Sequence, residues 1–509
     1  MDLLCQTRTP GIIAPTELKS CYDRICHNIA SLCMQRQGVQ ESEVQSMFQP
    51  LQYLQHTIRC AYGNSTETYG SNHWETPMQG VYQGNGAGPI IWAVVSSPLL
   101  QILREDGFGT FFDTSISRKT IRIVGYAFVD DTDLIQTAKD GQSFDEVLDE
   151  MQKALNLWEG LIKTTGGALA VDKCRWWGID FEWKNGNWRY KTVAELQGIL
   201  SAIDTHNQRD IVKQLEVHDS YETLGVLLSA DGNQDDEIEY LHKKSSKWAD
   251  RIRVSFLGES EAAKALQTTI IKKLEYPLLA LTLSRNECDH ILWPLYNAIL
   301  PKTRINRHFS RTVLRAPGGH MGLEFPCLYT QQVTAHVKCL LRHGGTNSIT
   351  GQLLEASIEV AKTEIGLGGP LFQINFDTHG FLLTNSWIKE VWHELESNQI
   401  EFFEKTISLQ LYREHDEFLT QVFARQKYPK YQLSQLNHCR VYLCVTMISD
   451  IVSGNGDYIL PSFTDVAQPS NPRAPYSSLK WPEQGQPSES AWSLWRRALR
   501  ECLSADNSY

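Results

Sequence analysis

Apolar residues recur every three or four positions in several parts of the chain, which predicts amphipathic helices. The clearest such segment covers residues 144–162, with apolar positions at Phe144, Val147, Leu148, Met151, Leu155, Trp158 and Leu161. Residues 233–345 are also expected to be mostly helical. A helix is expected over about 193–203, and another in the tail that reads SAWSLWRRALREC.

A β-hairpin is predicted over residues 181–190. Asn185-Gly186 is a two-residue turn of the kind that joins antiparallel strands tightly. The resulting register pairs compatible side chains across the two strands. Trp183 lies opposite Trp188 and Phe181 opposite Tyr190, and the acidic Glu182 lies opposite the basic Arg189. A further short apolar strand is expected around Leu224–Leu228.

These patterns divide the chain into four regions: 1–190, 191–232, 233–345 and 346–509. The first region alternates helical and strand-like segments, the second connects the first to the third, and the third is helical. The last begins Gly-rich, becomes helical, and carries a Pro/Ser-rich stretch at about 461–490 that we expect to be a surface loop or linker. The fold class expected from this order is α+β.

Composition narrows the class of protein. The chain has 509 residues, is 42% hydrophobic and carries a formal net charge of −11. It contains no apolar run of 18 residues and no signal-peptide pattern, and its 12 cysteines are dispersed. We therefore expect an intracellular protein, nuclear or cytoplasmic, with free thiols. The negative net charge argues against nucleic-acid binding unless basic residues cluster locally.

Such a cluster lies between Ala298 and Gly322, a stretch without Asp or Glu. Its basic residues are Lys302, Arg304, Arg307, Arg311 and Arg315, and the last four are spaced so that they would share one face of a helix. That face could follow a phosphate backbone, or it could simply be a solvated surface. Lys272 and Lys273 could extend it.

The main chemical signal is Asp130-Asp131, flanked by strand-like runs within residues 121–135. Adjacent carboxylates repel each other unless a cation neutralises them. Hard divalent ions prefer such oxygen ligands, and paired ions suit phosphoryl transfer. A solvated turn would also explain the pair on its own.

The sequence around this pair resembles reverse transcriptases of non-LTR, LINE-like retrotransposons. Phe128-Val-Asp-Asp131 resembles their motif C. Four further segments follow in the family's order over residues 11–345: Glu17–Asp23 resembles motif A, Gln83–Pro89 motif B, Gly166–Lys173 motif D, and Tyr221–Gly232 the strand and turn of the primer grip.

The resemblance implies a role for each matching residue. Glu17, Asp130 and Asp131 would hold Mg²⁺ or Mn²⁺, and Tyr22 would reject a ribose 2′-hydroxyl. Gln83 and Gly84 would touch the incoming nucleotide, and Lys173 would lie near its triphosphate. It also implies a polymerase palm, with an antiparallel sheet backed by helices, then a helical thumb and a mostly helical C-terminal extension. The partners would be an RNA template, a DNA primer and deoxynucleoside triphosphates, without a membrane.

Two departures leave alternatives open. Motif A carries Glu17 where the family has Asp, and only sixteen residues precede it, so we expect the fingers to be largely missing. An RNA-directed DNA polymerase impaired by these changes is the first hypothesis. A catalytically inactive nucleic-acid-binding remnant is the second, and a relic that neither binds nor catalyses is the third. No pattern assigns a function to residues 346–509.

Overall fold

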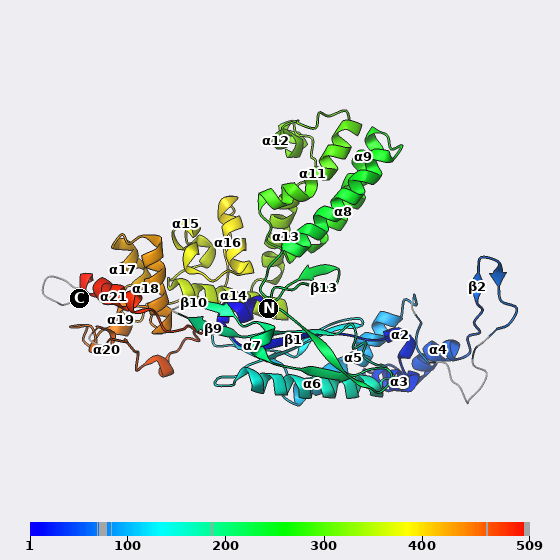
Figure 1. Ribbon diagram of the computed structural model, residues 1–509, viewed down its shortest axis with the longest axis horizontal. Coiled ribbons are helices and arrows are strands. Elements are labelled where there is room, and N and C mark those ends of the chain that lie inside the picture. Colours follow the sequence, from blue (N-terminus) through cyan, green and yellow to red (C-terminus); the bar gives the residue numbers. More distant parts are fainter. Residues whose placement is uncertain (69, 71–78, 83, 185–186, 465–466, 503–509) are drawn as a thin grey trace.

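The computed structural model describes residues 1–68, 70, 79–82, 84–184, 187–464 and 467–502. A sheet covered by helices forms the base, an arm of long helices rises from it, and a helical C-terminal region lies beside the base (Figure 1). None of the helices in the described residues is long and apolar enough to span a membrane.

The central sheet has six strands and is mixed. From one edge to the other these are β11 (Leu200–Ile203), β12 (Arg209–Leu215), β8 (Arg175–Ile179), β1 (Gly11–Glu17), β7 (Asp131–Thr137) and β6 (Gly125–Phe128). Most neighbours are antiparallel, but β12 runs parallel to β8. The prediction of an antiparallel sheet is therefore wrong for this pair. The chain between β8 and β12, residues 180–208, leads back so that β12 runs in the same direction as β8.

Two helices supply most of the apolar cover of this sheet. The amphipathic helix predicted over 144–162 is confirmed as α6 (Phe144–Thr164), and it begins with a capping box between Ser143 and Glu146. The apolar α5 (Gly88–Glu105) packs beside it. Trp158 of α6 and Trp176 of β8 are fully buried in the shared core, so this layer holds the sheet rigid.

The hairpin prediction is confirmed in register. In β9 (Phe181–Lys184) and β10 (Asn187–Tyr190), Phe181 pairs with Tyr190, Glu182 with Arg189 and Trp183 with Trp188. The predicted turn, Asn185-Gly186, lies outside the described residues.

The helix predicted over 193–203 is wrong beyond its first turn. The helix α7 ends at Leu196 (Val193–Leu196), and β11 follows. Gln197 takes a left-handed conformation (φ 45°) and is followed by Gly198, which together end the helix. The edge strand β11 then continues the sheet, so tertiary pairing overrides the local helical pattern.

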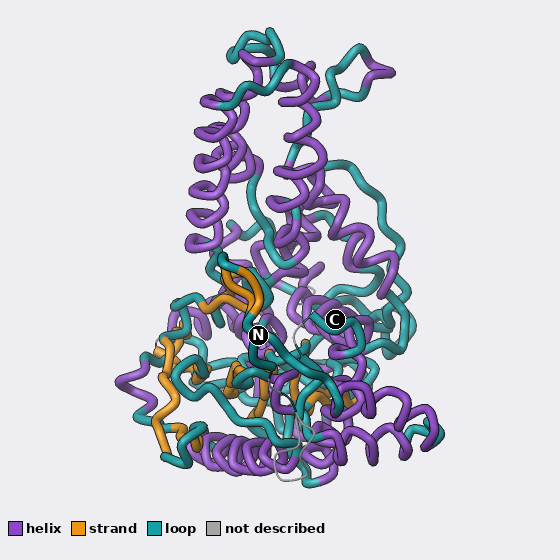
Figure 2. The backbone as a smooth tube through the Cα atoms, turned by 90° about the vertical axis from the view of Figure 1, so that its right-hand side faces the viewer, coloured by secondary structure: helices purple, strands orange, loops and turns teal. Residues whose placement is uncertain are grey.

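The predicted helical character of residues 233–345 is confirmed. They form the helical arm, which stands away from the base in both views (Figures 1 and 2). Its elements are α8 (Asp235–Val254), α9 (Glu259–Ala265), α10 (Ile271–Leu274), α11 (Arg285–Lys302), α12 (Arg311–Arg315) and α13 (Leu328–His343). The pair α8 and α11 packs along its length around Leu241, Ile291 and Leu295.

The C-terminal region is packed against the base. Its helix α14 (Ile349–Ile365) packs against α16 (Trp387–Ser397) and α18 (Lys430–Tyr442). The helix α18 in turn contacts α17 (Leu419–Arg425) and the predicted tail helix, which is confirmed as α21 (Glu489–Glu501). The Pro/Ser-rich stretch is not a free linker. Lys480 N donates to Ser115 O (2.9 Å) and Glu483 N to Thr7 O (3.0 Å), so the stretch is fixed across the base.

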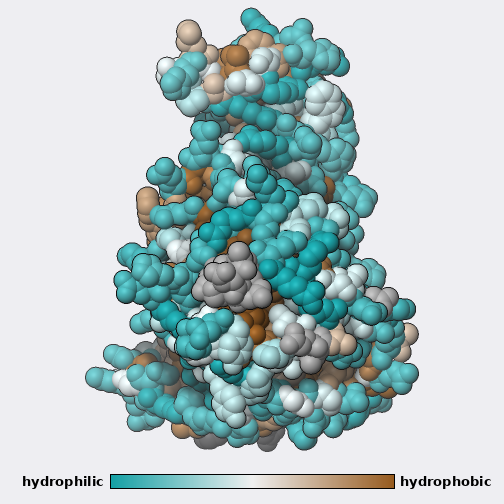
Figure 3. Space-filling model, turned by 90° about the vertical axis from the view of Figure 1, so that its left-hand side faces the viewer, coloured by the Kyte–Doolittle hydropathy of each residue, from teal (hydrophilic) through white to brown (hydrophobic). Residues whose placement is uncertain are grey.

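The outer face of these two parts is mainly hydrophilic, with apolar atoms gathered at the top of the arm (Figure 3). Val254 and Phe256, where α8 ends, are among the most exposed apolar residues of the described chain. Apolar side chains otherwise lie mostly inside, so the arm and the C-terminal region each carry their own core.

Candidate functional site

Three carboxylate residues meet at one end of the central sheet. Glu17 ends β1 and stands opposite Asp131, the first residue of β7. Asp130 lies in the two-residue turn between β6 and β7, and its carbonyl accepts from Leu18 N (3.2 Å). The other turn residue, Val129, has a φ of 58°. This conformation is strained for a β-branched residue, and it fixes the acidic turn at the end of the strands.

The segment that contains Lys173 is held against the same end of the sheet. Ala170 N donates to Glu17 O (2.9 Å), and Leu169 forms a bridge with Leu18. Lys173 Nζ then forms an ion pair with Glu17 Oε1. Two segments about 150 residues apart in sequence thus place an ammonium directly on the first carboxylate.

A strand from the predicted primer grip reaches the site as well. Tyr221 begins β13 (Tyr221–Thr223), and its hydroxyl donates to Lys173 O (3.2 Å). The strand turns at Leu224-Gly225 and pairs with β14 (Val226–Leu228), which is shorter than the predicted strand. The base of the arm therefore begins beside the acidic site.

The pKa values reflect this concentration of negative charge. Burial, followed by the charges of Asp130 and Glu17, raises the pKa of Asp131, while Lys173 acts in the opposite direction. The hydrogen bond to Glu17 raises the pKa of Lys173, which stays charged. Burial and then the charge of Glu17 raise the pKa of Tyr221 to about 12. The site is acidic, and one ammonium compensates part of its charge.

Tyr22 lies on α2 (Cys21–Arg24), next to the acidic turn and to the start of α5. Its carbonyl accepts from Val81 N (2.7 Å), and a Cβ added at Gly88 would lie 3.5 Å from the ring of Tyr22. Gly84 has a φ of 90°, and no atom lies within 4 Å of the Cβ position that it lacks. Its backbone is thus open to a close approach. Gln83 lies outside the described residues.

A metal ion does not fit the side chains as they are placed. Carboxylate oxygens suit a hard divalent ion, but within the described residues no three His, Cys, Asp or Glu side chains are gathered as a ligand set. Glu17, one of the three expected ligands, is already paired with Lys173. The structure brings the predicted residues together without forming the predicted metal site.

The arginine stripe predicted on one helix face is wrong. The helix α11 ends at Lys302, Arg304 is left-handed (φ 58°), and only residues 311–315 form α12. Asn306 Oδ1 accepts from His308 N (2.8 Å), a local turn that competes with helix formation.

Its arginines also have other partners. Arg304 Nε lies 3.5 Å from a carboxylate oxygen of Glu259, and Arg315 pairs with Asp289. The guanidinium of Arg311 lies 4.9 Å from the ring centroid of Tyr296. Arg307 remains exposed in the connecting turn. A continuous phosphate-binding stripe therefore does not form there.

A basic surface runs along α8, and sequence reasoning named only its Lys273. This basic flank consists of Tyr240, Lys244, Lys247, Trp248 and Arg251, together with Lys273 of α10. The charged atoms of Arg251 and Lys273 each lie 5.3 Å from the Trp248 ring, and Lys244 lies 5.1 Å from Tyr240. The spacing of three and four between its α8 members was the available signal.

The basic flank is connected to the acidic site through one tyrosine. The Tyr276 hydroxyl donates to Leu224 O (2.9 Å), in the turn that follows Tyr221. Tyr276 is 61% exposed, so its ring lies on the surface. It follows Lys273 of the flank by three residues and thus connects that segment to the turn beside Tyr221.

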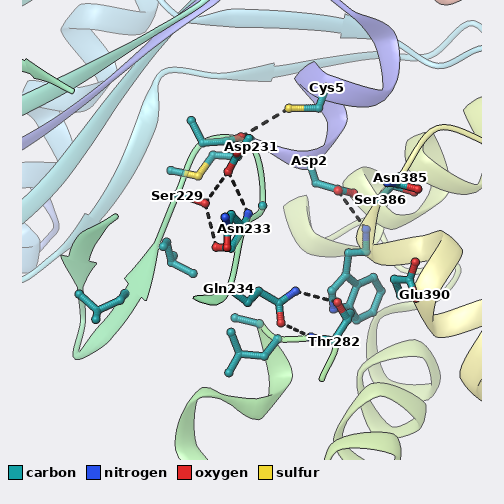
Figure 4. A pocket seen from close by; sticks show the side chains of 18 residues that line it. Asp2, Cys5, Ser229, Asp231, Asn233, Gln234, Thr282, Asn385, Ser386 and Glu390 are labelled. Carbon is teal, nitrogen blue, oxygen red and sulfur yellow. Dashed lines mark hydrogen bonds between the residues drawn. The ribbon is translucent and has the colours of Figure 1, made fainter. Parts of the chain in front are cut away.

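A separate hollow lies where the arm, the base and the C-terminal region meet (Figure 4). Its volume is about 460 Å³, and Asp2, Asp231 and Glu390 are among its 18 lining residues, none of which is Lys or Arg. Such a lining repels phosphate groups.

No known protein-family model matches the chain, and no curated protein matches it. Among solved structures, it is similar to telomerases. Telomerase from Candida albicans in complex with a TWJ fragment of telomeric RNA is 13% identical, covers 68% of this chain and 49% of its own, and gives a TM-score of 0.25. Apo telomerase from Candida tropicalis is 12% identical, with 70% and 48% covered and a TM-score of 0.29.

The chain spans about half the length of the telomerases it matches. TM-scores of this size do not establish a shared fold. The function proposed below therefore rests on the geometry of the acidic site.

Proposed function

We propose that the chain is a reverse-transcriptase-like protein that binds a primer–template duplex, with the primer end directed at the acidic site. One observation carries this proposal. The segment with Glu17 and Tyr22, the turn with Asp130, the segment with Lys173 and the strand with Tyr221 are far apart in sequence yet meet at one end of one sheet. Their order along the chain supports a LINE-like retrotransposon as the origin.

The surroundings of Tyr22 support a nucleotide at this place. Its ring packs over Gly88 at the start of α5, and the backbone at Gly84 is open. We propose that an incoming deoxynucleoside triphosphate lies here, with its sugar against Tyr22. Gln83 and Gly84 would touch the base pair, and Lys173 would face the phosphates once it leaves Glu17.

The basic flank supports a path for the duplex. Its segment at Lys273 is followed by Tyr276, which bonds to the turn after Tyr221, and its other members lie along one face of α8. The aromatic rings hold the lysine and arginine side chains in place. These cations can then bind the phosphates of a nucleic-acid backbone. A local basic surface reconciles duplex binding with the net charge of −11.

Mg²⁺ or Mn²⁺ belongs to the proposal as the ion that polymerase chemistry of this kind requires. Glu17, Asp130 and Asp131 would be its ligands. Because Glu17 is paired with Lys173 and no three-residue ligand set is formed in the described chain, the proposal does not extend to a chemical step through a bound metal.

Primer extension on an RNA template, with Mg²⁺ or Mn²⁺, tests synthesis. We would compare the natural chain with Glu17→Asp and Asp130→Asn. Synthesis that Asp130→Asn abolishes would locate the polymerase site at the acidic turn. Synthesis by Glu17→Asp alone would show that the substitution at position 17 silenced an otherwise intact site.

A second candidate function is duplex binding without synthesis, and the ion pair between Glu17 and Lys173 favours it. It predicts salt-sensitive binding with no extension product from the natural chain under either ion. If duplex binding is absent at low salt, both candidates are wrong.

A further inference from the structure

We propose that the ammonium of Lys173 is the built-in cation of the acidic site, so that a divalent ion binds there only when this ammonium is displaced. The identity of the site rests on the proposed function. The test uses protein without nucleic acid, so a failure of this inference and a failure of duplex binding are distinguishable.

The first argument is that the position of Lys173 is fixed by its backbone. Lys173 N donates to Ala170 O (2.9 Å), and Lys173 O accepts from the Tyr221 hydroxyl (3.2 Å). Ala170 in turn is bonded to the carbonyl of Glu17 (2.9 Å). The backbone of Lys173 is therefore held next to Glu17, within reach of the glutamate carboxylate.

The second argument comes from the length of the acidic side chain. Glu carries its carboxylate one methylene further from the backbone than Asp does, a difference of about 1.5 Å. Glu17 reaches the Lys173 ammonium, and its side chain is 23% exposed. An Asp at this position would end short of that contact, so the glutamate and the lysine form a matched pair.

The third argument is one of charge. Glu17, Asp130 and Asp131 are clustered, and Asp131 senses the charges of both neighbours and of Lys173. A cation that is part of the chain lowers the attraction of this cluster for a further cation. It also occupies Oε1 of Glu17, an oxygen that an octahedral ion could otherwise use.

Mn²⁺ binding to the protein alone tests the proposal, measured by the loss of the free-ion electron paramagnetic resonance signal. We expect the natural chain to bind Mn²⁺ weakly and Lys173→Met to bind it at least tenfold more tightly. Lys173→Arg, which keeps the positive charge, should resemble the natural chain. Glu17→Asp should gain affinity, because its carboxylate no longer reaches the ammonium.

Two controls locate the effect. Lys191→Met removes an ion pair of similar exposure, with Asp180 (2.5 Å), away from the acidic site, and it should leave Mn²⁺ binding unchanged. The double variant Lys173→Met with Glu17→Gln should lose the affinity gained by Lys173→Met alone. Circular dichroism melting of each variant shows whether it is folded.

Equal Mn²⁺ affinity in the natural chain and a folded Lys173→Met variant would overturn the proposal, since the ammonium would then not compete with the ion. Failure of both folded proteins to bind Mn²⁺ would overturn it as well, because removal of the lysine would then leave no usable set of oxygens. If Lys173→Met does not fold, Glu17→Asp and Lys173→Arg decide the question between them.

Discussion

The charged groups of the C-terminal region and those of the acidic site are held in different ways. Arg440 is fully buried, and its guanidinium donates to Asn437 Oδ1, Val445 O, Thr363 O and Glu364 O. Lys362 and Glu404 form an ion pair (2.5 Å), and both side chains are almost completely buried. Glu17 and Lys173, by contrast, are partly exposed and hold mainly each other.

This difference separates structural charges from exchangeable ones. A buried charge with saturated hydrogen bonds cannot change partners without a large loss of stability. A partly exposed pair contributes little to stability and can exchange its partner for a ligand. The C-terminal network is therefore structural, while the acidic site and the basic flank have the properties of a binding surface.

The largest effect is expected from Arg440→Met. It removes the guanidinium donors of the buried carbonyls of Thr363 and Val445, while Glu364 O keeps a bond from Asn437 Nδ2 (2.9 Å). We expect a loss of about 3–5 kcal/mol in the free energy of unfolding, measured by chemical denaturation. As a control, Arg253→Ala removes an exposed pair with Asp250 and should cost less than about 1 kcal/mol. Similar losses of unfolding free energy in both variants would contradict the distinction between structural and exchangeable charges.

Charge reversal on the basic flank should have the next largest effect. Lys244→Glu combined with Arg251→Glu should weaken binding of an RNA–DNA duplex by about tenfold or more at low salt, because phosphate contacts are lost. The difference should shrink as salt rises. Lys153→Glu combined with Lys405→Glu, at two exposed lysines outside the flank, is the control with the same change of net charge in a fluorescence anisotropy titration. An equal loss in the control would mean that only net charge matters.

A smaller effect is expected from Tyr276→Phe. This change removes the hydrogen bond to Leu224 O that connects the arm to the turn beside the acidic site. An exposed hydrogen bond of this kind contributes about 1 kcal/mol or less, so thermal stability should fall only slightly. Hydrogen exchange of the turn at 224–225 should increase. Unchanged exchange there would show that the tyrosine does not couple the two parts.

The smallest effect concerns pH. Burial lowers the pKa of His438, whose Nε2 lies 2.8 Å from Gly485 O. The unfolded chain then binds this proton more readily than the folded one, so stability is lost as pH falls below the ordinary histidine range. We expect a lower melting temperature at pH 5.5 than at pH 7.5, and a smaller difference in His438→Gln. An identical difference in that variant would assign the dependence to other groups.

Local patterns in the sequence predicted those elements whose signal lies within a few residues. The hairpin at 181–190 and the helix α6 follow from alternation and from a period near 3.6, and both are confirmed. The parallel pairing of β12 with β8 is a long-range choice without a local signal. Likewise, the periodic arginines at 304–315 could share a face only if the helix formed, and the turn at Asn306 prevents it.

The acidic site shows the same limit. The motifs indicated which residues would meet, and Glu17, Asp130, Asp131 and Lys173 do lie together. That Lys173 would pair with Glu17 depends on how residues 168–170 align against β1, which no local spacing specifies. The basic flank was missed because Glu239 and Asp250 lie among its cations along α8, whereas the stretch from Ala298 to Gly322 has no acidic residue.

The helix α14 lies in the C-terminal half of the sequence, but it packs against the base, which is formed by the N-terminal half. Its Ala356 and Val360 lie in the same apolar cluster as Leu4, Ile13 and Trp177 of the base. Glu359 accepts from the backbone of Ile116 (2.7 Å) and Ser117 (2.9 Å). A protein shortened at residue 345 would expose that apolar surface and aggregate. The base that carries the acidic site therefore depends for its stability on a helix from the C-terminal half of the chain.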